Sequence, residues 1–137
     1  MNLENKSKTY KTGEHIVYSC QYHVIFCPKY RRKVLIAPYD DILKQILLDV
    51  AKQYQFEILE MEVMPDHVHL LVDCDPRFGI ANCIKKMKSV SAHILRKDYK
   101  YFQSKLPTLW TRSYFVSSVG SVSLETVKKY IEEQKGK

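Results

Sequence analysis

Residues 56–73, FEILEMEVMPDHVHLLVD, decide the fold. The first half, Phe56 to Val63, and the second half, His67 to Asp73, are both rich in the apolar and β-branched residues that favour strands. Pro65 and Asp66 stand between the two halves and are typical turn residues. Strands joined by so short a connection pair antiparallel, so this stretch predicts a β-hairpin.

The chain on either side of this hairpin predicts five further elements. Two stretches carry apolar residues at helical spacing, and two others carry the β-branched and aromatic residues of strands. Near the C-terminus, Ser123 can cap a helix, and Glu125 stands near its positive end. In chain order we expect a strand over His15 to Cys27, a helix over Pro38 to Tyr54, the hairpin, a helix over Ile80 to Lys100, a strand over Leu109 to Ser118 and a helix reaching Gln134.

The expected order is therefore β-α-β-β-α-β-α. Its first six elements predict an α+β, ferredoxin-like (split βαβ) fold, with one antiparallel sheet and two helices on one face. We expect one domain over residues 1–137, with residues 1–13 as a flexible arm. The fold alone does not determine a function.

Charge points to a polyanionic partner. The 22 lysines and arginines exceed the 15 acidic residues, which gives a net charge of +7. A surplus of this size in a small domain favours nucleic acid first and an acidic membrane surface second. No apolar run is long enough to span a bilayer, and the polar N-terminus does not resemble a signal peptide. We therefore expect a cytoplasmic protein without a membrane partner, whose four cysteines are reduced and mostly buried.

His67 and His69 are the first candidates for chemistry. Alternate residues of a strand share a face, so the two imidazoles should stand on the face that the helices do not cover, with Val68 and Leu70 packing beneath the helices. Two imidazoles roughly 6–7 Å apart along a strand can converge on one divalent ion. An H-x-H pair alone is weak evidence, because partly exposed strand histidines are common. A metal site needs a third ligand from elsewhere.

Two tyrosine–glutamine pairs stand one helical turn apart. Tyr130 and Gln134 belong to the last predicted helix, whereas Tyr99 and Gln103 end the second long helix. A glutamine could supply an oxygen ligand while the tyrosine reaches a phosphate polarised by the same metal. Spacing alone does not choose between the pairs, and either tyrosine could simply be a surface residue.

Several of these segments together resemble a known family, the single-tyrosine HUH transposases. The segments are PDHVHLL at 65–71, YHVIFCPKYRRKVL at 22–35, YFVSSVG at 114–120 and the C-terminal Y-x-x-x-Q. These small enzymes belong to the simplest insertion sequences, which move as single-stranded DNA, and the REP-associated tyrosine transposases are their relatives. The resemblance runs from about His15 to Gln134, with the motifs in the family's order.

The resemblance implies a role for each candidate residue. His67 and His69 would be paired ligands of Mg²⁺ or Mn²⁺, with Gln134 as the third. Tyr130 would attack a DNA phosphate, leaving a 5′-phosphotyrosine and a free 3′-hydroxyl. The family also implies a prokaryotic homodimer, in which the tyrosine helix of one subunit completes the metal site of the other, and single-stranded DNA substrates with subterminal hairpins.

Basic residues in two groups are the candidate DNA contacts. They follow the first strand and line the second long helix, where we expect phosphate contact without sequence reading. Tyr30 and His93 are interleaved and could stack on unpaired bases. The predicted set is Lys29, Arg31, Arg32, Lys33, Lys85, Lys86, Lys88 and Arg96.

Other functions would also explain part of the pattern. A non-catalytic, ferredoxin-like module that binds single-stranded nucleic acid fits the charge but leaves His67, His69 and Gln134 without a role. A domesticated hairpin-processing HUH nuclease is closer to the main hypothesis. Replication initiators and relaxases share the chemistry but are often joined to further domains, and a two-histidine phosphoesterase would need a second histidine motif that His15 and His23 do not provide.

Overall fold

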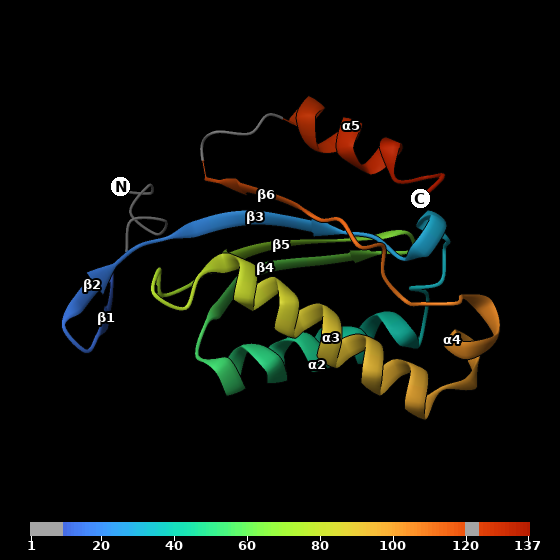
Figure 1. The fold of residues 1–137 in the computed structure, drawn as a ribbon, viewed down its shortest axis with the longest axis horizontal. Helices are drawn as coiled ribbons and strands as arrows, with labels where there is room; N and C mark the ends of the chain where they lie inside the picture. The colour runs from blue at the N-terminus through green and yellow to red at the C-terminus, as the bar shows by residue number, and fades with distance from the viewer. Residues whose placement is uncertain (1–9, 120–123) are drawn as a thin grey trace.

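A computed structural model describes residues 10–119 and 124–137, and within them a four-stranded antiparallel sheet forms the centre of the protein. The order across the sheet is β4–β5–β3–β6. Helices α2 (Tyr39–Tyr54) and α3 (Ile80–Asp98) lie side by side on one face (Figure 1). This order and placement are those of the ferredoxin-like fold expected from the sequence. The strands are β3 (Gln21–Phe26), β4 (Glu57–Met64), β5 (His67–Asp73) and β6 (Phe115–Ser118).

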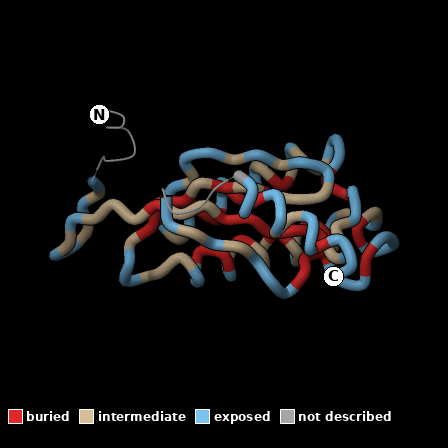
Figure 2. Tube along the Cα trace, turned by 90° about the horizontal axis from the view of Figure 1, so that it is seen from above, coloured by how far each residue is buried: buried red, intermediate tan, exposed pale blue. Residues whose placement is uncertain are grey.

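The hydrophobic core lies between this sheet and the two helices. Along β5, Val68, Leu70 and Val72 are fully buried, and they alternate with residues of the other face. Leu47 of α2 and Met87 of α3 are also fully buried in the same cluster. Buried segments run through the middle of the molecule and exposed ones along its outline (Figure 2). Alternating burial in β5 therefore leaves one face of the sheet free of α2 and α3.

The N-terminal region differs from the sequence expectation. β1 (Lys11–Gly13) pairs with β2 (Ile16–Tyr18) in a separate hairpin, so the last part of the expected flexible arm is ordered structure; residues 1–9 lie outside the described residues. The strand expected over His15 to Cys27 is also divided, into β2 and β3. The division falls where the Cys20 amide donates to the side-chain carboxylate of Asp73 instead of to a main-chain carbonyl.

The second long helix is shorter than expected. α3 ends at Asp98, Tyr99 is extended, and a separate helix α4 (Lys100–Lys105) follows. This break turns the chain so that Phe102 becomes fully buried in the core. The apolar spacing continues through the break, which is why the sequence pattern does not reveal it.

The last strand is also shorter than the predicted Leu109 to Ser118. In residues 109–111 the chain makes only an isolated bridge, with Trp110 opposite Pro28. The backbone then leaves the ladder, and regular pairing with β3 begins at Phe115. The carbonyl groups freed at Thr111, Arg112 and Ser113 accept hydrogen bonds from the Lys88 ammonium instead.

Helix α5 (Leu124–Glu133) lies on the face of the sheet opposite α2 and α3 (Figure 1). Ile25 of β3 points to this face, because its strand neighbours Val24 and Phe26 belong to the core, yet Ile25 is fully buried. Val127 of α5 is buried as well. The cap predicted at Ser123 lies outside the described residues.

Two further observations concern the cysteines and the apolarity of the helices. All four cysteines are free; Cys27, Cys74 and Cys83 are buried and Cys20 is partly exposed. In the described part of the chain, no helix combines the length and apolarity needed to cross a bilayer.

Candidate active site

His67 and His69 stand on the same face of β5, as the sequence predicts. Both are partly buried, whereas Val68 between them is fully buried in the core on the other face. α5 lies on the histidine face (Figure 1). The two candidate ligands and the helix that carries the candidate nucleophile therefore share one side of the sheet.

A third histidine joins this pair. His23 of β3 places its Nδ1 3.3 Å from His69 Nε2, with the ring centroids 5.5 Å apart. His23 pairs with Leu71 in the ladder, two positions from the Ile25–His69 pair and on the same face, so the two rings meet diagonally. The sequence alone does not reveal this contact, because it depends on the register between β3 and β5.

His69 is held in its neutral form. Burial lowers the pKa of His69, the neighbouring His23 lowers it further, and Glu62 opposes both effects. Glu62 is the residue paired with His69 on β4. A lowered pKa keeps the imidazole unprotonated, which is the form that binds metal ions.

His67 is oriented by the residue before it. Asp66 Oδ1 lies 2.9 Å from His67 Nδ1, so the ring can donate to the carboxylate and leave its Nε2 lone pair free. A carboxylate on the second ring nitrogen is a common support for a metal-binding histidine. From the sequence, Asp66 was interpreted only as a turn residue. Its place directly before His67 could have indicated that it supports the imidazole.

Ser113 contacts both C-terminal candidate residues, Tyr130 in α5 and Gln134 directly after it. Its Oγ donates to Gln134 Oε1 at 3.1 Å and lies 3.4 Å from the Tyr130 hydroxyl. The Tyr130 ring packs 5.4 Å from Phe115, and Gln134 is buried. Burial raises the pKa of Tyr130, and the hydrogen bond with Ser113 lowers it in part.

The tyrosine and the histidines are on the same face but are not in contact. Phe115, which packs on Tyr130, pairs with Ile25, and Ile25 pairs with His69. Two strand spacings place the backbones of Phe115 and His69 about 10 Å apart. Residues 10–119 and 124–137 contain no group of three His, Cys, Asp or Glu side chains that could hold a metal ion. The predicted third ligand, Gln134, is bonded to Ser113.

The second tyrosine–glutamine pair lies elsewhere. Tyr99 ends α3 and packs edge-on against Tyr39 of α2, with 5.7 Å between ring centroids. The Gln103 amide donates to the Arg96 carbonyl. Both residues belong to the helical layer on the other side of the sheet from His67, so the structure favours Tyr130 over Tyr99.

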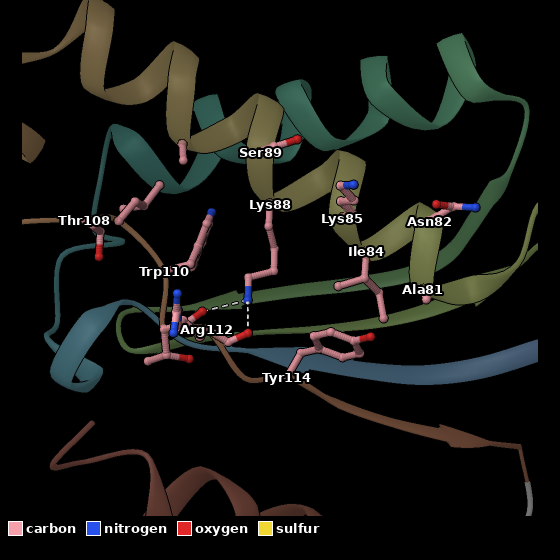
Figure 3. Close-up of a pocket in the computed structure, with 13 residues that line it drawn as sticks. Ala81, Asn82, Ile84, Lys85, Lys88, Ser89, Thr108, Trp110, Arg112 and Tyr114 are labelled. Atoms are coloured by element: carbon pink, nitrogen blue, oxygen red, sulfur yellow. Dashed lines mark hydrogen bonds between the residues drawn. The ribbon is translucent and has the colours of Figure 1, made fainter.

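Lys88 does not lie on an open surface. It lines a pocket of about 580 Å³ between α3 and residues 108–114 and reaches main-chain carbonyls, the nearest at 2.7 Å (Figure 3). Burial lowers its pKa to about 8. One of its acceptors is the carbonyl of Ser113, so Lys88 supports from behind the segment that holds Tyr130.

The other predicted DNA contacts fall into two kinds. Arg31 and Arg96 are partly buried and bonded to other groups of the protein: Arg31 pairs with Asp66, and Arg96 donates to the Leu106 carbonyl. The other five side chains are either exposed, as Lys33 and Lys85 are, or lie over an aromatic ring. Cations stack on the rings in three cases, Lys29 and Arg32 on Tyr30 and Lys86 on Tyr54. The lysines of α3 and the histidines of β5 lie on opposite sides of the sheet.

Comparison with known proteins identifies the class of protein to which this fold and site belong. Residues 16–134 match the family model described as "Transposase IS200 like". The ISDra2 transposase TnpA of Deinococcus radiodurans is 41% identical over 129 residues, covering 93% of this chain and 92% of that protein. The transposase of insertion sequence element IS200 from Salmonella typhimurium is 28% identical, covering 90% and 82%.

Solved structures agree with the sequence matches. A crystal structure described as that of a transposase from Deinococcus radiodurans R1 superposes with a TM-score of 0.83 at 37% identity, covering 93% of this chain and 99% of that one. A REP-associated tyrosine transposase bound to a REP hairpin shares the fold, with a TM-score of 0.59 at 13% identity, covering 90% and 69%. The chain is a transposase and belongs to the IS200-like family.

Proposed function

We propose that this protein cleaves and rejoins single-stranded DNA at insertion-sequence ends, through a covalent bond between Tyr130 and a 5′-phosphate. The observation that carries the proposal is the shared face of His67, His69 and α5, which places paired imidazoles and a tyrosine helix on one side of the sheet. Membership of a transposase family supplies the setting in which such chemistry is needed.

The residues on this face suit Mg²⁺ or Mn²⁺. Asp66 occupies Nδ1 of His67 and leaves Nε2 available, while the lowered pKa of His69 favours its neutral form. The Gln134 amide oxygen is the proposed third ligand, and this mixture of nitrogen and oxygen donors is acceptable to Mn²⁺. When bound, the ion would polarise the phosphate that is attacked. His69 would have to exchange its contact with His23 for the ion.

In the cleavage step, Tyr130 Oη forms a bond to phosphorus and the bond from phosphorus to the 3′-oxygen breaks. The 3′-oxygen leaves as a hydroxyl after taking up a proton, and the phenolic proton passes to solvent. A hydrogen bond with Ser113 Oγ, 3.4 Å away, orients the Tyr130 oxygen. Attack by another 3′-hydroxyl reverses the step, so rejoining needs no external energy source.

The proposed assembly is a homodimer with composite sites. Gln134 sits on Ser113, and Tyr130 packs on β6, two strands from His69. Bringing the amide to the histidines requires a displacement of α5 or a helix supplied by a second copy. We propose the second, in agreement with the family resemblance, with single-stranded DNA hairpins as substrate and the exposed lysines and arginines as phosphate contacts.

The deciding experiment is covalent capture of labelled single-stranded DNA in the presence of Mn²⁺. Tyr130→Phe removes only the nucleophilic oxygen, so it should bind DNA but form no adduct, and EDTA should abolish the adduct of the wild-type protein. Tyr99→Phe is the matched control and should remain active, because Tyr99 lies in the helical layer. An adduct mapped to Tyr99, or cleavage that survives in EDTA, would refute the assignment.

Mixing two inactive variants tests the composite site. Tyr130→Phe and His67→Ala subunits should, after exchange, form heterodimers with one intact site if the helix acts on the other subunit, and cleavage should return. A site built within one chain would carry a defect in every subunit. The mixture would then remain inactive, which would overturn the trans arrangement.

A further inference from the structure

Arg31 connects the histidine strand with α5 of the same chain. Its Nε lies 3.4 Å from Asp66 Oδ2, and Asp66 Oδ1 lies 2.9 Å from His67 Nδ1. Its Nη1 lies 3.3 Å from the carbonyl oxygen of Ile131 and 3.4 Å from a carboxylate oxygen of Glu132, both in the last turn of α5. One guanidinium therefore reaches from the histidine strand to the tyrosine helix.

These charges are shielded from solvent where the histidine is supported. The side chains of Arg31, Asp66 and His67 are 13%, 18% and 16% exposed. Partial burial strengthens a charge interaction relative to a surface ion pair. Glu132 is 73% exposed, so its pairing with Arg31 contributes less than the contact with the Ile131 carbonyl.

The backbone at Arg31 is unusual. Tyr30 and Arg31 have φ angles of 60° and 52°, in the left-handed region that non-glycine residues rarely adopt. The turn is tied down by the hydrogen bond from the Lys29 amide to the Leu109 carbonyl, at 2.8 Å, and by that from the Arg31 amide to Pro28. Such strained backbone persists only where the surroundings impose it, and here it directs Arg31 toward Asp66 and α5.

Arginine suits this position better than lysine. A guanidinium donates in several directions from one rigid plane, so it can serve a carboxylate and a carbonyl together. The carbonyls in the last turn of a helix lack helical partners and carry partial negative charge, which a cation stabilises. A lysine ammonium would keep the charge but not the two-sided geometry.

We propose that Asp66 and Arg31 are positioning residues: Asp66 fixes the ring of His67, and Arg31 fixes Asp66 and the end of α5 at once. The inference rests on the proposed function, because it takes His67 as a metal ligand. Metal affinity and the placement of the nucleophile are then linked through one side chain. Arg31 is assigned to this link and removed from the predicted phosphate contacts.

The test is Mn²⁺ affinity of the full-length protein without DNA, measured from the paramagnetic resonance signal of free Mn²⁺. Asp66→Asn should weaken binding about 10–100-fold, the usual effect of losing such a supporting group. Arg31→Gln should weaken it less. The double variant should bind as weakly as Asp66→Asn alone, because Arg31 acts on the metal through Asp66. Arg77→Gln is the matched control: Arg77 pairs with Asp75, 2.7 Å away, beyond the other end of β5.

A second measurement follows α5 directly. Hydrogen exchange of the α5 amides should be faster in Arg31→Gln than in the wild-type protein, since the Ile131 carbonyl keeps only the Gln134 amide of its two donors, and unchanged in Arg77→Gln. Thermal unfolding shows that each variant is folded; if Arg31→Gln is not, Arg31→Lys replaces it, with an affinity between those of the wild type and Asp66→Asn.

Each of the following results would overturn the inference. Wild-type affinity in the Arg31 variant would remove the link, and a double variant whose loss equals the product of the single losses would show that the two residues act independently. If the wild-type protein binds Mn²⁺ and forms the adduct, and these variants have the same Mn²⁺ affinity, the inference fails and the proposed function stands. If the wild-type protein binds no Mn²⁺, the metal site and the inference fail together.

Discussion

The two faces of the central sheet use the same strands for different purposes. On one face Val68 and Leu70 are fully buried against α2 and α3. On the other, one residue away in each case, His67 and His69 are partly exposed and surrounded by polar partners. Because neighbouring residues of a strand point to opposite sides, core residues and proposed metal ligands are separated within a single strand.

The functional face is nevertheless not open to water throughout. Ile25 is fully buried there, and Asp73 at the far end of β5 is only 2% exposed. Polar groups in such surroundings interact more strongly than they would in water. This face of the sheet is therefore partly shielded from solvent, although it carries no second complete hydrophobic core.

The largest expected effect is on the functional face. His69→Ala should reduce formation of the DNA adduct by more than about 100-fold, because losing a direct ligand exceeds the roughly 10–100-fold cost of losing a supporting residue. The thermal midpoint should change little, since the side chain is only partly buried. The capture assay with Mn²⁺ measures the first effect and a melting curve the second. Activity within tenfold of the wild type would contradict a ligand role.

The adjacent residue should show the opposite behaviour. Leu70→Ala removes a fully buried side chain from the core and should lower the free energy of unfolding by about 2–5 kcal/mol. Urea unfolding measures this loss, and the folded variant should keep the Mn²⁺ affinity of the wild type. A loss below about 1 kcal/mol would show that the two faces contribute more equally to stability.

The smallest effect is expected at Asp73. Burial raises the pKa of this carboxyl, with the Cys20 amide opposing the shift. The folded state then holds the proton more tightly than the unfolded state, so this group stabilises the protein at low pH and the contribution is lost as pH rises through the raised pKa. Asp73→Asn should therefore be more stable than the wild type at pH 7.5, by a fraction of the Leu70→Ala effect.

Urea unfolding at two pH values checks the sign. The advantage of Asp73→Asn over the wild type should be larger at pH 7.5 than at pH 4.5, since asparagine does not titrate. An equal difference at both values would show that Asp73 does not contribute to the pH dependence of stability.

Local patterns predicted the parts of the fold that depend on local physics. β5 runs from His67 to Asp73, as expected from its alternating residues, and the pleat alone places both histidines on one face. α2 begins one residue after the expected start and ends at Tyr54 as expected. The break at Tyr99 and the late start of β6 were missed because they depend on what the chain packs against.

The site was only partly predictable for the same reason. The spacing of Tyr130 and Gln134 predicts that they lie on one side of the chain. Their hydrogen bonds with Ser113 are tertiary contacts, which spacing does not predict. His23 reaches His69 through strand register. In the sequence Lys88 looks like one more lysine on a solvated helix face, and only the fold of residues 108–114 around it shows that it is partly buried and bonded to main-chain carbonyls.

The order of pairing in the sheet has a consequence for folding. β3 is an inner strand and pairs with β6, so Tyr22 must meet Ser118. Contacts between residues so distant in sequence form late and slowly. α5 follows β6 in the chain, and Tyr130 packs on Phe115 of that strand. We therefore expect the helix that carries the proposed nucleophile to reach its place on the sheet only after this last strand has paired.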